Sequence, residues 1–409
     1  MKVLMLSWEY PPHNVGGLGK HVMELVPALA RAGVEVHLIT PRWLGGAGKE
    51  AIQETVVDPA HPEPAPATVY RIEPPSVDRA DFFTDAWRTN VVMEEHGKLL
   101  LEAGGYDLIH VHDWLVAFAG VALKHAYRLP LAATIHATEY GRSRGLPTND
   151  VGRQIHNVEW WLTYEAWRVI CCSQFMAREI AAVFQTPTDK LDVVPNGVDT
   201  SRFDRLNGAD LTEFRRRYAL DWEKVVFYVG RVVHEKGVHL LVEATSRLLG
   251  DRPDVKVVIA GTGGSLAACR YRAQELGLSD KVLFTGFIPD EERDGLFKVA
   301  NVAVFPSLYE PFGIVALEAM AAHLPVVVAD VGGLSEVVTH QETGLTVYPD
   351  SVESLVWGIR ETLDHPDRAR ARAENAYRMV RERYNWGAIA RGTLDVYRRV
   401  AAERQLATW

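Results

Sequence analysis

The fold is decided by residues 3–39, which read VLMLSWEYPPHNVGGLGKHVMELVPALARAGVEVHLI. Residues 3–7 are apolar without alternation and predict a buried strand, and a loop rich in proline and glycine follows at 11–19. Apolar residues then recur at helical spacing over 22–30, and residues 34–39 predict a second strand. A strand, loop, helix and strand within this length form a βαβ unit.

The alternation continues in two series of apolar runs. The strands expected from them are 107–112, 131–136 and 191–194 in the first series, and 225–229, 255–260, 282–284, 302–305 and 325–329 in the second. Such runs are typical of parallel strands covered by helices on both faces. We therefore predict an α/β protein of two doubly wound, Rossmann-like domains facing a central cleft, with residues 1–200 in the first and 201–384 in the second. Residues 58–76 are rich in proline and are expected to form a surface excursion.

Composition limits the classes of function. The 409 residues are 47% hydrophobic and 24% charged, as in an ordinary globular protein, and the net charge of -9 argues against binding to nucleic acid or an anionic membrane. The three cysteines form no CxxC pair, which favours a reduced compartment. The apolar run at the N-terminus is too short for a signal segment or a membrane span, so we expect a cytoplasmic protein.

The strongest chemical signal is EPFGIVALE, residues 310–318. It follows a predicted strand and opens a helix, so free N–H groups at Gly313, Ile314 and Val315 would form a seat for a diphosphate. Glu318, two turns into the helix, could accept hydrogen bonds from a ribose, and Glu310 could hold sugar hydroxyls. The plainer alternative is two surface glutamates that flank a helix N-terminus.

A second signal is GRVVHEKG at 230–237, directly after another strand. Arg231 and Lys236 can place two cations beside a departing diphosphate and stabilise the charge that develops there. An ordinary basic loop is the alternative.

The loop NVGGLGK at 14–20 lacks the ending of a P-loop and fits the dinucleotide fingerprint poorly. Its paired glycines, Gly16 and Gly17, still let the backbone come close to a phosphate or a sugar. A tight turn without any ligand is equally compatible with them.

Histidines gather at two strand ends. Alternation places His110 and His112 on one face of their strand, which raises the question of a metal site. No carboxylate or cysteine stands at convincing ligand spacing, so we predict that no metal is bound. Asp113 and His136 are expected to position sugar hydroxyls.

Taken together, these segments resemble the retaining glycosyltransferases of the GT-B fold, family 4, and the related bacterial and archaeal glycogen synthases. The matching pieces are SWEYPP (7–12) with GGL (16–18), HVHDW (110–114), TIH (134–136), PNGVD (195–199), GR (230–231) with EKG (235–237), GTG (261–263), EPFGIVALE (310–318) and GGLSE (332–336). Each piece is weak alone, but their order and their places at strand ends make the set specific.

The resemblance implies roles for these positions. Glu310 would contact the donor sugar and Glu318 the donor ribose, Arg231 and Lys236 would neutralise the diphosphate, and His136 would lie near the 6-hydroxyl of the sugar. Gly16 and Gly17 would approach the donor from the first domain. It also implies a C-terminal helix, 385–409, that crosses back to the first domain. The mechanism it implies is metal-independent and front-face, with the donor phosphate taking the acceptor proton.

The expected reaction moves a glucosyl unit from ADP-glucose or UDP-glucose to an α-glucan, with no further cofactor. Where classical bacterial glycogen synthases carry lysine, cysteine and leucine, this chain has Asn14, Phe312 and Ile314, which leaves the base of the nucleotide and the glucan acceptor open. The sequence says nothing of the oligomeric state.

Other functions share parts of the pattern. A sucrose-phosphate or trehalose-type synthase would need cations for a phosphosugar acceptor, and Arg142, Arg144 and Lys20 are candidates. A nucleotide-sugar 2-epimerase would need no acceptor. An inverting transferase would use Asp113 as general base. A sugar-binding protein without activity would not need Arg231 and Lys236 together.

Overall fold

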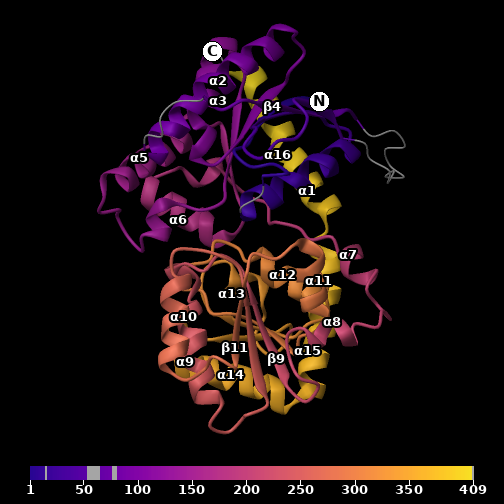
Figure 1. Cartoon of the computed structure of the whole chain (residues 1–409). Coiled ribbons are helices and arrows are strands. Elements are labelled where there is room, and N and C mark those ends of the chain that lie inside the picture. The colour runs from indigo at the N-terminus through magenta and orange to yellow at the C-terminus, as the bar shows by residue number, and fades with distance from the viewer. Residues whose placement is uncertain (14–15, 53–64, 76–80, 408–409) are drawn as a thin grey trace. The chain divides into compact units, whose positions relative to one another are not determined.

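The structure is a computed structural model, and it describes residues 1–13, 16–52, 65–75 and 81–407. The chain divides into two compact units (Figure 1). The first unit consists of Met1–Gly197 together with Trp386–Trp409, and the second of Val198–Asn385. The boundaries thus fall near the expected positions 200 and 384, and the last helix belongs to the first unit.

The first unit is built on an eight-stranded sheet of order β3-β4-β2-β1-β5-β6-β7-β8. All neighbouring strands are parallel except β3 and β4. The strands are β1 (Lys2–Leu6), β2 (Glu35–Pro41), β3 (Lys49–Ala51), β4 (Ala67–Ile72), β5 (Leu108–His112), β6 (Leu131–Ile135), β7 (Arg168–Cys171) and β8 (Leu191–Val193). Helices connect the parallel strands: α1 (Gly17–Arg31), α2 (Phe82–Glu102), η1 (Trp114–Val116), α3 (Ala117–Tyr127), α4 (Glu139–Arg142), α5 (Asp150–Glu165), α6 (Gln174–Phe184) and η2 (Thr188–Lys190).

The second unit has a six-stranded sheet of order β11-β10-β9-β12-β13-β14, parallel throughout. The strands are β9 (Lys224–Val229), β10 (Val255–Ala260), β11 (Val282–Gly286), β12 (Val302–Phe305), β13 (Val326–Ala329) and β14 (Leu345–Val347). The helices are α7 (Ser201–Asp204), α8 (Thr212–Arg216), η3 (His234–Lys236), α9 (Val238–Leu248), α10 (Leu266–Glu275), α11 (Asp290–Val299), α12 (Ile314–Ala321), α13 (Leu334–Val337), α14 (Val352–Asp364) and α15 (Pro366–Arg383). Both sheets are doubly wound, which confirms the predicted α/β fold of two Rossmann-like domains.

Burial explains the apolar runs of the central strands. In β1, Val3 and Met5 belong to the core beneath α1, while Leu4 and Leu6 are also completely buried, on the other face of the sheet. A strand that is covered on both faces needs apolar residues at every position. That requirement made the central strands recognisable from sequence.

The last helix, α16 (Trp386–Leu406), completes this core. Figure 1 shows it in yellow beside the indigo α1, and the two helices pack together. Its buried residues in the core are Trp386, Ile389, Ala390, Leu394, Val396, Tyr397 and Val400. The chain enters and leaves the second unit at neighbouring points, because the Val198 N–H donates to the Tyr384 carbonyl at 2.8 Å.

One expectation is wrong. Residues 58–76 were expected to form a surface excursion, but β4 (Ala67–Ile72) is a buried strand paired with β2 on one side and β3 on the other. Prolines on both sides hide this short strand in the sequence, although proline is compatible with a strand's ends. Residues 58–64 and 76 of that stretch lie outside the described residues.

Candidate active site

The second unit has its topological switch point between β9 and β12, where the order of strands reverses. The loops that leave these two strands are held together. The backbone N–H groups of Leu308 and Tyr309 donate to the Glu235 carbonyl at 2.8 and 3.2 Å. Gly237 has φ +67°, and a Cβ there would stand 1.9 Å from the Pro306 carbonyl oxygen, so only glycine fits this approach.

These loops bring Lys236 and Glu310 into contact. The Lys236 ammonium donates to Glu310 Oε2 at 2.6 Å, and the Ser307 hydroxyl donates to the same oxygen at 3.2 Å. The two charged side chains are only 18% and 10% exposed. Burial, followed by the charge of Glu310, raises the pKa of the Tyr228 phenol, whose hydroxyl donates to the Arg231 carbonyl at 2.8 Å. A buried tyrosine thus supports the loop on which Arg231 lies.

Arg231 itself does not join this pair. Its guanidinium is 45% exposed and lies 3.2 Å from a carboxylate oxygen of Glu235. It remains on the same loop as Lys236, after β9, and its exposed end is available to a ligand.

The start of α12 follows directly on Glu310. Its N-cap, Gly313, has φ +102°, and a Cβ on it would lie 2.5 Å from a methyl carbon of Leu334. The loop is also fixed from the segment before α13, because the Gly333 N–H donates to the Glu310 carbonyl at 2.8 Å. The first N–H groups of a helix, here those of Ile314 and Val315, have no partner within the helix and favour an anion.

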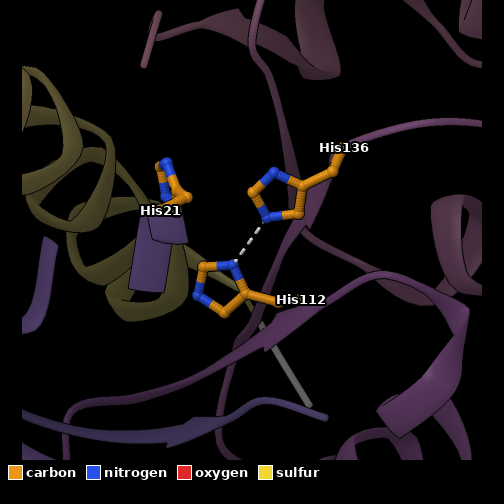
Figure 2. Close-up of side chains that lie close together, drawn as sticks. All are labelled: His21, His112 and His136. Atoms are coloured by element: carbon orange, nitrogen blue, oxygen red, sulfur yellow. Dashed lines mark hydrogen bonds between the residues drawn. The ribbon is translucent and has the colours of Figure 1, made fainter. Parts of the chain in front are cut away.

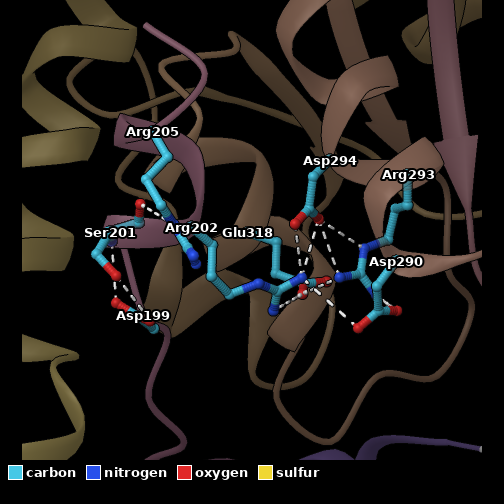
Figure 3. Close-up of polar contacts among 8 residues, drawn as sticks. All are labelled: Asp199, Ser201, Arg202, Arg205, Asp290, Arg293, Asp294 and Glu318. Carbon is cyan, nitrogen blue, oxygen red and sulfur yellow. Dashed lines mark hydrogen bonds and ion pairs between the residues drawn. The ribbon is translucent and has the colours of Figure 1, made fainter. Parts of the chain in front are cut away.

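Glu318, on α12, lies in a buried ion-pair cluster that the sequence did not reveal (Figure 3). Its side chain is 1% exposed, and Oε1 lies 3.7 Å from the guanidinium groups of both Arg202 and Arg293. Arg202 also donates to both carboxylate oxygens of Asp294, at 2.9 and 2.8 Å. Both guanidinium groups are cations, so each attracts the carboxylate of Glu318.

The first unit has its switch point between β1 and β5. After β1, the carboxylate of Glu9 accepts from the N–H groups of Gly16 at 3.1 Å and Gly19 at 3.3 Å, at the N-terminus of α1. Among the described residues other than its chain neighbours, no atom lies within 4 Å of the position a Cβ would take on Gly16, which leaves open space there. Gly17 is the first residue of α1.

Three histidines from separate elements meet beside β5 (Figure 2). His112 Nδ1 lies 3.1 Å from His136 Nε2, and the ring of His21, on α1, has its centroid 4.8 Å from that of His136. Burial lowers the pKa of all three, that of His136 to about 3, so these imidazoles are neutral at physiological pH. Sequence reasoning did not include His21.

His110 serves a different purpose. Its ring lies beside that of His112, with centroids 4.3 Å apart, as strand alternation predicts. Its two nitrogens, however, are satisfied by the Tyr397 hydroxyl at 2.7 Å and the Thr134 hydroxyl at 2.8 Å. Tyr397 comes from α16, so His110 ties the last helix to the sheet.

Among the described residues, the histidine cluster is a group that could hold a metal ion. One nitrogen from each of His21, His112 and His136 lies within 4.8 Å of the others. Nitrogens bound to one tetrahedral zinc ion are about 3.3 Å apart. The group contains no carboxylate, and His112 and His136 are hydrogen-bonded to each other. The absence of a bound metal therefore stays a prediction.

Asp113 lies at the end of β5 with φ +60°, a backbone conformation that is uncommon for residues other than glycine. Its carboxylate accepts the His136 N–H at 2.6 Å. Burial raises the pKa of Asp113 to about 6, against the opposing effect of the Arg142 charge. The structure thus links Asp113 to the backbone of His136, and the two predicted residues are neighbours.

Two doubly wound sheets in one chain, each with polar residues at its switch point, define the GT-B class of fold. Residues 15–202 match the family described as Glycosyltransferase Family 4, and residues 211–379 match Glycosyl transferases group 1. The chain is 39% identical to an uncharacterized glycosyltransferase of Methanocaldococcus jannaschii, over 97% of this chain and 98% of that protein. It is 36% identical to a glycogen synthase of Mycobacterium tuberculosis, over 99% and 95%.

A solved structure shares the whole fold. Sucrose-phosphate synthase from Thermosynechococcus elongatus superimposes with a TM-score of 0.81 at 26% identity, over 98% of this chain and 99% of that one. The protein belongs to glycosyltransferase family 4 and is a GT-B glycosyltransferase. Among the residues that the structure describes, no helix combines the length and the apolar character needed to cross a bilayer.

Proposed function

We propose that the protein transfers a glucosyl unit from ADP-glucose or UDP-glucose to an α-glucan, with retention of the anomeric configuration and without a metal ion. The observation that carries this proposal is the Lys236–Glu310 pair at the entrance to α12. It joins a cation suited to a diphosphate and a carboxylate suited to sugar hydroxyls beside a helix N-terminus. We assign the donor to the second unit and the acceptor to the first.

The donor diphosphate would bind at the N–H groups of Gly313, Ile314 and Val315. An ammonium group has three N–H donors, so Lys236 can keep its bond to Glu310 and still donate to a phosphate oxygen. Arg231, on the same loop, would add a second cation. Together they stabilise the negative charge that develops on the leaving nucleoside diphosphate.

In the proposed reaction, the bond between the anomeric carbon and the phosphate oxygen breaks, and the acceptor oxygen bonds to the same face of that carbon. The acceptor proton passes to an oxygen of the departing diphosphate, so no protein base is required. In the second unit, Glu310 holds hydroxyls of the transferred sugar and Glu318 holds the ribose. In the first unit, His136 holds a sugar hydroxyl, and Gly16 and Gly17 leave room for a sugar or a phosphate at the start of α1.

The acceptor is proposed as a neutral glucan because a glycogen synthase is 36% identical over almost the whole chain. Arg142 is a candidate for binding a phosphosugar, and its surroundings also favour a neutral acceptor. Its charge faces the carboxyl groups of Asp113 and Glu159, and Glu139 lies 4.0 Å away. A phosphate at Arg142 would meet the carboxylates of Asp113 and Glu139.

The likeness to sucrose-phosphate synthase supports a second candidate, in which the acceptor is a small phosphosugar. Incubation of the protein with labelled ADP-glucose or UDP-glucose, and with glycogen or fructose 6-phosphate, separates the two. We expect label in glycogen, joined through α linkages. Transfer to fructose 6-phosphate alone would replace the first proposal by the second. An isomerised donor without transfer would indicate an epimerase, and a β product would overturn retention.

A further inference from the structure

The segment that carries His136 is held through its backbone by two buried carboxyl groups. The His136 N–H donates to Asp113 Oδ1 at 2.6 Å, and the N–H of Ala137 also donates to Asp113. Three residues after His136, the Glu139 N–H faces both oxygens of Glu159, at 2.9 and 3.0 Å. The two acceptors come from different parts of the fold, Asp113 from the end of β5 and Glu159 from α5.

Glu159 is a costly residue for this position. The residue is 1% exposed, on the face of α5 that also buries Ile155, Val158 and Leu162. A carboxyl group in such a place loses its hydration, and an apolar side chain would avoid that loss. The Glu159 carboxyl instead provides a fixed acceptor for the Glu139 N–H in the first turn of α4. A helix leaves its first N–H groups without a partner of its own.

We propose that Glu159 is a positioning residue for the transfer reaction. Together with Asp113 it forms a carboxyl clamp, defined as these two side chains, which fixes the backbone of residues 136–139. The clamp thereby sets the direction in which the His136 imidazole points. This inference rests on the proposed role of His136 in holding a sugar hydroxyl.

The charges around the clamp decide which form Glu159 takes. The groups that face it are Glu139 and Arg142 on α4, together with Asp113. Burial raises the pKa of Glu159 to about 8, so at neutral pH it is mostly a neutral acid. A neutral carboxyl keeps a carbonyl oxygen that accepts the Glu139 N–H. Glutamine offers the same oxygen without a titrating proton.

The test compares three variants of the full chain. Glu159→Ala removes the acceptor, Glu159→Gln keeps it, and Glu165→Gln is the matched control. Glu165 also lies on α5 and is hydrogen-bonded, but its partners are Lys124 and His125, away from the clamp. The measurements are the kcat and KM of glucosyl transfer, and amide hydrogen exchange over residues 136–141.

We expect Glu159→Ala to lower kcat by about tenfold to a hundredfold, because the clamp no longer holds His136 in line. Exchange over residues 136–141 should rise in the same variant. Glu159→Gln should keep most of the wild-type kcat and the full wild-type protection of these amides from exchange. Glu165→Gln should match the wild type in both measurements. Wild-type kcat and exchange in Glu159→Ala would overturn the proposal.

If Glu159→Ala fails to fold, hydrogen exchange at the Glu139 amide decides. This amide should be protected in the wild type and in Glu159→Gln, because both side chains offer it an acceptor oxygen. Exchange at the rate of an open amide in the wild type would overturn the clamp. These exchange measurements need no activity, so a wild type that transfers no glucose would contradict the proposed function and leave the clamp to be judged by them.

Discussion

Lys236 and Glu310 are joined at 2.6 Å although 74 residues separate them in the chain. The first follows β9 and the second follows β12, the two strands on either side of the switch point. Parallel strands that are neighbours in the sheet deliver their loops to the same edge. The sheet order therefore brings the two residues together, and the charge of each side chain is neutralised by that of the other.

Removal of either partner should abolish most of the activity. We expect Lys236→Met and Glu310→Gln each to lower kcat for glucosyl transfer by about a hundredfold to a thousandfold, as for the loss of one electrostatic contact in a preorganised site. The matched control is Arg247→Met, which breaks the exposed ion pair with Glu353 in the same unit. It should leave the rate unchanged. Wild-type rates in the first two variants would remove their assigned roles.

The arginines beside Glu318 should matter for the donor. Arg202→Met leaves Glu318 with one of its two cations, so its carboxylate should be less well fixed for the ribose. We expect KM for the nucleotide-sugar to rise by about tenfold with a smaller change in kcat. Arg205→Met is the control, because Arg205 follows the same short helix and its guanidinium donates to the Ser201 carbonyl, away from Glu318 (Figure 3). An unchanged KM in Arg202→Met would argue against ribose binding at Glu318.

Tyr397→Phe should affect stability and not chemistry. It removes the hydroxyl partner of His110 Nδ1, which is completely buried. A buried polar atom left without a partner costs about 1–3 kcal/mol of unfolding free energy. Denaturant unfolding should show this loss while kcat stays within about twofold of the wild type. A large fall in kcat without loss of stability would mean that His110 takes part in the reaction.

The pKa of Glu159 predicts a pH-dependent stability. Its value in the folded protein, about 8, lies above the ordinary 4.5, so the folded state binds the proton more tightly. The stability is fully present below pH 4.5 and is lost progressively as the pH rises to 8. The glutamine of Glu159→Gln cannot lose a proton. The melting temperature of this variant should therefore rise relative to that of the wild type as the pH increases from 5 to 8. A constant difference over that range would contradict the raised pKa.

Chelation should leave the reaction intact. Three histidine nitrogens lie within 4.8 Å of one another and could hold a metal ion, but the proposed chemistry uses cationic side chains at the diphosphate and needs none. We expect the rate after dialysis against EDTA to equal that before it. A loss that added Zn²⁺ or Mg²⁺ restores would show that a metal ion takes part.

Much of the fold and part of the site could be predicted from sequence, because both depend on buried strands that are easy to recognise. Strands such as β1 and β9 are buried on both faces and consist of unbroken apolar residues, so they stand out, and the polar residues just after them are candidates by position. Lys236 and Glu310 were found in this way. The short strand β4 was missed because the signal of a six-residue strand is weak beside prolines.

The residues that escaped prediction act through partners far away in the chain. Nothing in the neighbourhood of His21 distinguishes it from a surface histidine of an amphipathic helix, because its partners His112 and Asn196 come from other elements. Glu159 looks like any helical glutamate, and Arg202 like a linker residue. Only the folded chain shows that Arg202 lies against carboxylates, His21 against imidazoles and Glu159 against a backbone amide.

The place of α16 has a consequence for how the protein is made. A ribosome releases Met1–Gly197 long before Trp386, so the first unit waits for its closing helix while the whole second unit emerges. During that interval, the apolar surface of α1 that α16 will cover is open to chaperones or to other chains. Loss of the last twenty residues would therefore uncover this apolar surface and destabilise the first unit, while the core of the second unit would keep all of its own residues.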